Sequence, residues 1–316
     1  MIDNDLSSYL ATPDKLGKAK RIDDARGRYM WSVKNTFSKD KTLDGLKIVV
    51  DCANGSAYSM APTILWELGA EVIAIGDNPD GFNINQNCGS TSPQVLCKAV
   101  VEHKGNIGIA LDGDADRLVI VDEKGEVVHG DKIIGLIAEK LHDEGKLKQD
   151  TVVATQMSNL ALEEYLRYFG VSLIRTNVGD RYVLEEMKKG GYNFGGEQSG
   201  HIVLGDYSTT GDGLVAALQI LEILCSTKKP ISEIVNIFKL YPQILKNVKY
   251  QNGANPLDKA DVQSAIKSAQ EKLGNEGRIL VRKSGTENLI RIMAEGKDAG
   301  VIQEVVDGLA KTMNHE

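Results

Sequence analysis

Short apolar runs alternate with amphipathic segments along the first 130 residues of the chain. Runs of four or five apolar residues bounded by glycine and polar residues are typical of buried strands, whereas apolar residues three and four positions apart are typical of helices. The expected strands lie in KIVVDCANG, EVIAIGD, IGIALDGDADR and LVIVDE. The expected helices cover residues 24–36, 61–69 and 93–103. This alternation predicts a mostly parallel α/β sheet.

The same alternation starts again after residue 130 and changes character after Pro242. In the second part, helices are expected at 131–142, 160–169, 180–189 and 213–224, with strands in TVVATQ, SLIRTN and GYNFGGEQSGHIVL. In the third part, a strand is expected at 244–250, helices at 260–273 and 299–313, and two strands around the turn of RILVRKSGTENLIRIMAE.

This order of elements predicts two consecutive mixed or parallel α/β domains followed by a small α+β C-terminal domain. The predicted boundaries are 24–129, 130–243 and 244–316, and the polar residues 1–23 are expected to be a linker or the tail of an upstream domain. The length of 316 residues agrees with two or three domains.

Composition narrows the classes of function. A net charge of -7 and 5% aromatic residues argue against a broad nucleic-acid-binding surface. No apolar run approaches the roughly 18 residues that span a bilayer, and the N-terminus lacks the pattern of a secretory signal. The four cysteines form no CxxC pair, so we expect free thiols and a cytoplasmic protein.

The segment DGDADR is the strongest candidate for a functional site in the sequence. Asp112, Asp114 and Asp116 alternate with small residues directly after an expected strand, and alternate side chains of an extended backbone point to one side. Three converging carboxylates need a compensating cation, and hard oxygen ligands favour magnesium or calcium. An EF-hand is excluded because its sixth loop position requires glycine, where this chain has Arg117. The alternative is a solvated acidic turn.

Two further segments are suited to a phosphorylated polar ligand. GGEQSGH offers Glu197, Gln198, Ser199 and His201 between glycines, a set suited to sugar hydroxyls or an amine; the alternative is a polar hairpin turn. RKSGTENLIR places two arginines around a small hydroxyl-rich turn, which indicates a phosphate clamp; the alternative is a β-turn with surface arginines.

Together these segments resemble the α-D-phosphohexomutase superfamily from about residue 17 to the C-terminus. DGDADR resembles its metal-binding loop, GEQSGH its sugar-binding loop and RKSGTENLIR its phosphate-binding loop. Within the superfamily, VVDCANGSAY, LWELGAEV, GFNINQNCGST, TNVGDRYV and GGEQSGHIVL are most similar to the bacterial phosphoglucosamine mutases. Gln198 in the sugar loop supports that branch.

The resemblance implies a reaction and a set of site residues. A phosphoserine passes its phosphoryl group to glucosamine 6-phosphate, the bisphosphorylated sugar reorients, and glucosamine 1-phosphate leaves. Magnesium would be held by Asp112, Asp114 and Asp116. Sugar hydroxyls would be bound by Glu197 and Ser199, and the non-reacting phosphate by Arg282, Ser284, Gly285, Thr286 and Arg291. Arg117 and His201 would handle protons or charge at the reacting centre.

The chain departs from the family pattern in two respects. Lys283 and Asn288 stand where proline is usual, and we expect phosphate binding to survive in a less rigid loop. No Ser-His-Asn-Pro segment, which holds the family's reactive serine, occurs in the 316 residues. We therefore expect a chain without the phosphoserine domain that is inactive alone, and an exposed surface that favours homodimers.

Three other functions agree with the same segments. The chain would be part of a phosphomannomutase or of a phosphoglucomutase, or it would be a non-catalytic sugar-phosphate-binding protein. A HAD-type phosphatase fits poorly, because its DxDx[TV] pattern requires threonine or valine where this chain has Asp116. No nucleic-acid or membrane partner is expected.

Overall fold

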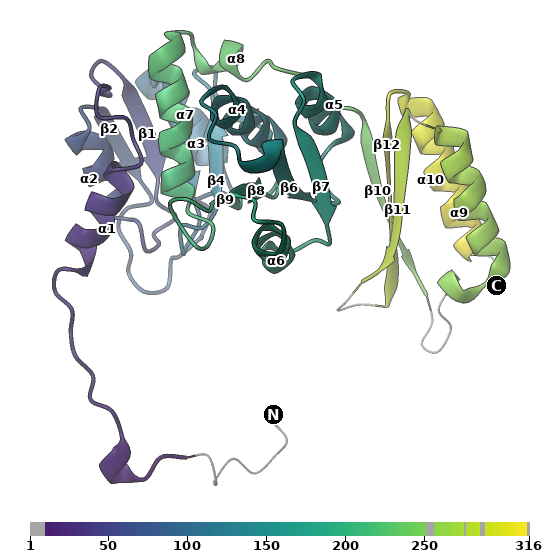
Figure 1. Ribbon diagram of the computed structural model, residues 1–316, viewed down its shortest axis with the longest axis horizontal. Helices are drawn as coiled ribbons and strands as arrows, with labels where there is room; N and C mark the ends of the chain where they lie inside the picture. Colours follow the sequence, from purple (N-terminus) through teal and green to yellow (C-terminus); the bar gives the residue numbers. More distant parts are fainter. Residues whose placement is uncertain (1–9, 251–255, 275, 285–287, 315–316) are drawn as a thin grey trace.

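Three β-sheets follow one another along the chain in the computed structural model, which describes residues 10–250, 256–274, 276–284 and 288–314. They lie side by side along the long axis of the molecule, with the C-terminal sheet at one end (Figure 1). The expected fold class is confirmed: two mixed α/β domains precede a small α+β domain. The boundaries 24–129, 130–243 and 244–316 remain our proposal.

The first sheet has five strands in the order β2-β1-β3-β4-β5. Its strands are β1 (Lys47–Asp51), β2 (Glu71–Ile75), β3 (Ile107–Leu111), β4 (Leu118–Val121) and β5 (Val127–Val128). The first three strands are parallel and the last two antiparallel, so the carboxyl ends of β1 and β3 meet at one edge. Its helices are α1 (Ala25–Lys34), α2 (Met60–Glu67) and α3 (Gln94–His103).

The second sheet has four strands in the order β7-β6-β8-β9, of which β9 is antiparallel to β8. The strands are β6 (Thr151–Thr155), β7 (Ser172–Thr176), β8 (Phe194–Gly196) and β9 (Ile202–Leu204). The helices are α4 (Gly130–Asp143), α5 (Leu160–Tyr168), α6 (Asp180–Gly190), α7 (Gly213–Thr227) and α8 (Ile231–Ile234). The 3-10 turns in the described part of the chain are η2 (Pro13–Lys15), η3 (Lys148–Asp150) and η4 (Pro256–Asp258).

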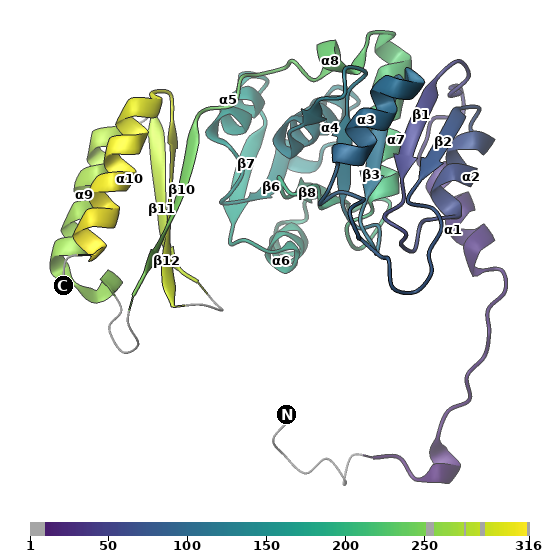
Figure 2. The same ribbon diagram turned by 180° about the vertical axis from the view of Figure 1, so that it is seen from behind.

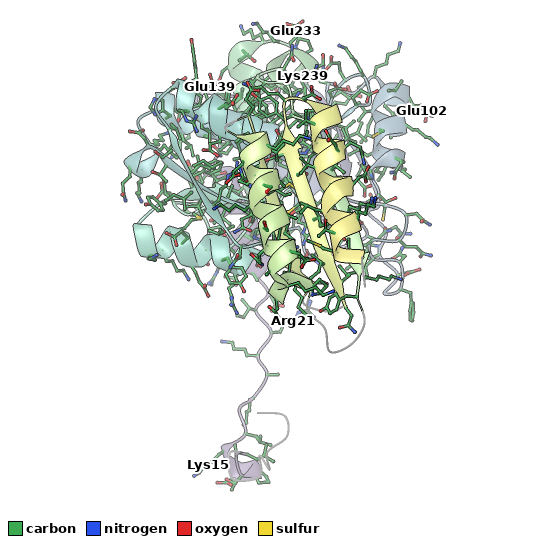
Figure 3. All side chains as sticks on the ribbon, turned by 90° about the vertical axis from the view of Figure 1, so that its right-hand side faces the viewer. Lys15, Arg21, Glu102, Glu139, Glu233 and Lys239 are labelled. Atoms are coloured by element: carbon green, nitrogen blue, oxygen red, sulfur yellow. The ribbon has the colours of Figure 1, made fainter. Side chains whose placement is uncertain are left out.

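The third sheet is antiparallel, in the order β10-β12-β11. Its strands are β10 (Gln243–Lys249), β11 (Gly277–Lys283) and β12 (Leu289–Gly296), and its helices are α9 (Ala260–Leu273) and α10 (Ala299–Asn314). Both helices cover the outer face of the sheet, as the end-on view shows (Figure 3). The other face of the sheet is directed toward the second domain (Figure 2).

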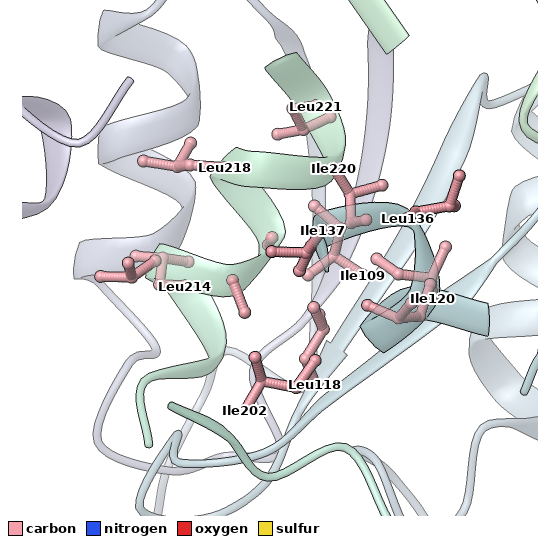
Figure 4. Packing of buried hydrophobic residues seen from close by; sticks show 14 of the residues in the cluster. Ile109, Leu118, Ile120, Leu136, Ile137, Ile202, Leu214, Leu218, Ile220 and Leu221 are labelled. Atoms are coloured by element: carbon pink, nitrogen blue, oxygen red, sulfur yellow. The ribbon is translucent and has the colours of Figure 1, made fainter. Parts of the chain in front are cut away.

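One hydrophobic core joins the first two domains, whereas the third has its own. Helix α7 lies between the first two sheets, and its buried Leu214, Leu218 and Ile220 belong to the same cluster as Ile109 of the first sheet and Ile202 of the second (Figure 4). Because the core is continuous, we expect the first two domains to behave as a rigid unit.

The predicted helices are confirmed to within a few residues; α9 matches its expected limits and α7 ends three residues later than expected. β5 and α8 were not predicted, because two and four residues are too short to establish a period. All four cysteines are free, as expected. Residues 10–24 are exposed and extend away from the domains (Figure 1). No helix in the described part of the chain has the length and apolarity that a bilayer span requires.

Candidate active site at the strand ends

The acidic loop joins β3 to β4 and brings three carboxylates together. Asp112, Asp114 and Asp116 each place a carboxylate oxygen within 4.8 Å of the other two. The backbone is not extended here, so alternation along a strand is not the cause of this convergence, contrary to expectation. Instead the Ala115 N–H donates to the Asp112 carbonyl at 3.1 Å, and Ala115 takes a left-handed φ of 64°. The carboxylates converge because the chain turns around them.

Backbone contacts from both sides hold this turn. The Ser56 N–H donates to the Gly113 carbonyl at 2.8 Å, and the Gly213 N–H donates to the Ala115 carbonyl at 2.9 Å. Gly55 lies so close that an added Cβ would overlap Gly113. Gly55, the glycine of DCANG, therefore permits a close approach of the chain to the acidic loop.

The charges of the loop are only partly balanced. Burial raises the pKa of Asp112, and the neighbouring charges of Asp116 and Asp114 raise it further. Arg117 is the nearby cation: its Nε lies 3.9 Å from a carboxylate oxygen of Asp112 and 3.9 Å from one of Asp116. Three oxygen ligands with surplus negative charge fit a hard divalent cation, so these residues suit the magnesium expected from sequence.

His201 lies behind the acidic loop and connects it to the sugar loop. Its Nδ1 is 3.2 Å from Asp116 Oδ2, and its side chain is only 3% exposed. Its buried Nε2 has no hydrogen-bond partner within the described part of the chain, and an added Cβ on Gly211 would lie 2.5 Å from it. Such a buried imidazole favours orientation of the Asp116 carboxylate over direct contact with a ligand.

The two loops also share backbone pairing. Arg117 and His201 form an isolated antiparallel bridge, and the Leu118 N–H donates to the Gly200 carbonyl at 3.0 Å. Gly200 has a φ of 95°, and an added Cβ would overlap the Leu118 carbonyl. The glycine after Ser199 therefore keeps the acidic loop and the sugar loop in contact.

Within the sugar loop, Glu197 is buried and Ser199 is exposed. The Gly179 N–H donates to Glu197 Oε1 at 3.0 Å, so one carboxylate oxygen is fixed and the other can accept from a hydroxyl. Gly179 is the N-cap of α6, within the segment NVGD (residues 177–180). Its contact with Glu197 could not be predicted, because the two residues are 18 positions apart in different loops.

The phosphate loop presents two arginines on neighbouring strands. Arg282 of β11 and Arg291 of β12 are directly opposite each other in the ladder. Like charges in this position repel, and the buried Arg291 Nε has no hydrogen-bond partner among the residues that the structure describes. Ser284 is buried, and Gly285 and Thr286 lie outside the described residues. A bound anion would relieve the repulsion, which supports a phosphate clamp.

A pocket of about 160 Å³ connects these arginines to the second domain. Its lining includes Arg282, Arg291, Met157 and Val178, and Val178 directly precedes the Gly179 that holds Glu197. The acidic loop, the sugar loop, the NVGD segment and the arginine pair thus form one sequence of contacts. Val178 is a site residue that sequence analysis missed, since a lone valine carries no chemical signal.

A second pocket of about 410 Å³ opens beside the acidic loop. Asp114 and Ala115 form one side, and α1 contributes Tyr29 to the other. The Tyr29 hydroxyl donates to Asp212 at 3.1 Å, which ties α1 to the start of α7.

Three family models match consecutive parts of the chain. They describe phosphoglucomutase/phosphomannomutase α/β/α domain II over residues 27–125, α/β/α domain III over 129–241 and the C-terminal domain over 245–312. A phosphoglucosamine mutase of Parvibaculum lavamentivorans is 55% identical over 314 residues, 99% of this chain and 70% of that protein. One from Rhodopseudomonas palustris (strain BisB5) is 55% identical over 97% of this chain and 68% of that protein.

Solved structures show the same fold. A phosphoglucomutase/phosphomannomutase family protein from Burkholderia thailandensis superposes with a TM-score of 0.76 at 20% identity, over 91% of this chain and 64% of that one. The Aspergillus fumigatus N-acetylphosphoglucosamine mutase, solved with GlcNAc-6P and magnesium, gives a TM-score of 0.68 at 20% identity, over 91% and 68% of the two chains. The present chain therefore spans about two thirds of the length of its relatives.

Proposed function

Because the chain belongs to the phosphoglucomutase/phosphomannomutase family, we propose that it binds glucosamine 6-phosphate and magnesium as the sugar-binding part of a phosphoglucosamine mutase. The observation that carries the proposal is the continuous set of contacts from the acidic loop through His201, Glu197 and Gly179 to the pocket with Arg282 and Arg291. The 52–55% identity to phosphoglucosamine mutases supports glucosamine as the sugar.

Each loop has a distinct task in this proposal. Arg282 and Arg291, with Ser284, Gly285 and Thr286, bind the phosphate that does not react. Glu197 accepts a hydrogen bond from a sugar hydroxyl through the oxygen that Gly179 leaves free, and Ser199 adds a second polar contact. Holding both ends of the ligand fixes the reacting oxygen next to the acidic loop.

At the acidic loop, Asp112, Asp114 and Asp116 hold the cation, which supplies positive charge for phosphoryl oxygens when bound. Arg117, whose side chain is 43% exposed, is placed to stabilise the same negative charge. His201 orients Asp116 from behind. No Ser-His-Asn-Pro segment occurs in the 316 residues, so we expect binding without turnover by this chain alone.

Calorimetric titration tests the proposal. The wild-type chain, in the presence of magnesium chloride, should bind glucosamine 6-phosphate more tightly than mannose 6-phosphate or glucose 6-phosphate. Arg291→Ala should weaken that binding at least tenfold, because one of the two guanidinium groups is lost. The control is Lys246→Ala, which removes an exposed salt bridge with Asp307 elsewhere in the same domain. Absence of binding by the wild type, or equal binding by Arg291→Ala, would refute the proposal.

A further inference from the structure

The inner face of the C-terminal sheet includes three rows of side chains that run across all three strands. Pairing across β10, β12 and β11 aligns Gln243, Glu295 and Arg278 in the first row, and Leu245, Met293 and Leu280 in the second. The third row consists of Asn247, Arg291 and Arg282. Residues two apart on a strand share a face, so all three rows are directed toward the second domain.

The first row binds the loop that follows β6 in the second domain. One Arg278 nitrogen, Nη2, donates to the carbonyls of Gln156 and Ser158, each at 2.7 Å. Gln243 Nε2 donates to the Met157 carbonyl at 3.4 Å. These bonds tie one end of the sheet to three consecutive residues of the neighbouring domain.

Glu295 keeps Arg278 in place for this task. The carboxylate is fully buried; it accepts from Arg278 Nε through Oε1 and from Gln243 Nε2 through Oε2 at 3.0 Å. A second guanidinium, that of Arg175, also donates to the Ser158 carbonyl, at 2.6 Å. A buried carboxylate between directed donors fixes the orientation of the Arg278 fork.

The hydrogen bonds from Arg278 and Gln243 to residues 156–158, here called the anchor, lie at a distance from the phosphate clamp, so a small rotation at the anchor produces a larger displacement at the clamp. Arg278 and Arg282 are four residues apart on β11, which is about 14 Å along a strand. A rotation of the sheet by about 10° around the anchor would therefore move the arginine pair by about 2.4 Å, well beyond the roughly 0.7 Å of lengthening at which a hydrogen bond is lost. The middle row, with Met157 and Val178 opposite, offers only non-directional apolar contact.

We propose that Arg278 is a positioning residue for the phosphate clamp. Arg278 ties the C-terminal sheet to residues 156–158 and so sets the distance between the arginine pair and the sugar loop. At that distance one phosphosugar can contact both. The inference rests on the proposed function, because it assigns the two ends of the ligand to those loops.

The consequence is specific to ligands that bridge the two domains. Inorganic phosphate needs only the arginine pair, so its affinity does not depend on where the sheet lies. Glucosamine 6-phosphate contacts the arginine pair and the sugar loop at once. Once its phosphate is bound, its affinity depends on how close the sugar loop lies to the sugar, that is, on the effective concentration of that loop. Loss of the anchor should weaken the binding of glucosamine 6-phosphate and leave the binding of inorganic phosphate unchanged.

The test variant is the double substitution Arg278→Met with Glu295→Gln, because loss of Arg278 alone would leave a buried carboxylate unpaired. Arg278→Lys is the second variant: it keeps a positive charge beside Glu295 but lacks the guanidinium fork. The matched control is Lys246→Met with Asp307→Asn, which removes an exposed salt bridge between β10 and α10. Thermal unfolding and circular dichroism establish that each 316-residue variant folds.

Dissociation constants for glucosamine 6-phosphate and for inorganic phosphate are then measured by calorimetry and phosphorus NMR. We expect at least tenfold weaker sugar-phosphate binding in both Arg278 variants, phosphate binding within twofold of wild type, and no change in the control. Equal weakening of both ligands, or of neither, would show that Arg278 has only a structural role. A wild-type chain that binds neither ligand would refute the proposed function and this inference with it.

Discussion

Replacing Asp112 with asparagine should stabilise the chain when no metal is bound. The three carboxylates of the acidic loop approach within 4.8 Å of one another, and Asp112 is the least exposed of them. At that separation two unit charges repel by about 3.5 kcal/mol in a medium of dielectric about 20 and by about 0.9 kcal/mol in water. Asp114 is exposed and Arg117 offsets part of the repulsion, so the lower figure is appropriate.

The side-chain shape is nearly unchanged by this substitution. Asparagine retains the Oδ1 that accepts from the Arg117 N–H at 3.1 Å, so the turn should keep its backbone geometry. It also removes a charge whose burial is unfavourable, as the raised pKa of Asp112 indicates. We therefore expect the free energy of unfolding to rise by about 1 kcal/mol in EDTA.

Magnesium should reverse the order of stability. A ligand at about 100 times its dissociation constant stabilises a folded protein by about 2.7 kcal/mol. Asp112→Asn loses one of three anionic ligands, so it should bind magnesium more weakly and gain less. With saturating magnesium chloride the wild type becomes the more stable protein.

Urea unfolding in EDTA and in magnesium chloride measures both free energies. Asp40→Asn is the control, because Asp40 is an exposed carboxylate of the same domain and its replacement changes the net charge equally. Lower stability of Asp112→Asn than of wild type in EDTA, or equal stabilisation of the two proteins by magnesium, would contradict this prediction.

Three further predictions concern stability. Burial raises the pKa of the Asp131 carboxyl in the folded chain. Its contribution to stability is therefore present at pH values below the ordinary aspartate pKa and is lost as the pH rises through the raised value. Asp131→Asn should gain stability relative to wild type as the pH rises, and a constant difference between their free energies of unfolding in urea from pH 4 to 8 would contradict this. Asp212→Ala removes the N-cap of α7 and should cost about 1–2 kcal/mol, whereas Asp212→Asn should retain most of it; equal losses in urea unfolding would exclude the capping explanation. Gly200→Ala should lower the thermal midpoint by several degrees, because an added Cβ would overlap the Leu118 carbonyl. Gly27→Ala should raise it slightly, because Gly27 lies in α1 and its added Cβ would meet none of the described atoms beyond its own helix within 4 Å; similar shifts for both variants would contradict this.

The sequence was sufficient for the elements, because each depends on neighbours within a few positions. Helix α9 was predicted with its observed limits since its apolar residues repeat at helical spacing over 14 residues. The acidic loop was found for the same reason, as its three aspartates are two residues apart. The predicted backbone conformation between these aspartates was wrong, because Ala115 has a left-handed φ that residues other than glycine seldom take.

Contacts between loops were beyond sequence analysis. Asp116 meets His201, and Glu197 meets Gly179, because strands β3, β8 and β7 end at positions that only the assembled sheets define. Arg278 was missed for a related reason. It resembles any surface arginine on an alternating strand until the register places it opposite Glu295 and the fold brings Ser158 to its other side.

The contacts within the first two domains and those to the third domain differ in what fixes them, because the third domain has a separate hydrophobic core. The acidic loop and the sugar loop both belong to the continuous core that α7 completes, so their separation is fixed by close packing. The arginine pair belongs to a domain with a separate core, and Arg278, Gln243 and a small apolar row join it to the second domain. A ligand held at both ends therefore depends on close packing at one end and on a few directed hydrogen bonds at the other, which makes the anchor at residues 156–158 the place where a small substitution should change affinity most without touching the ligand.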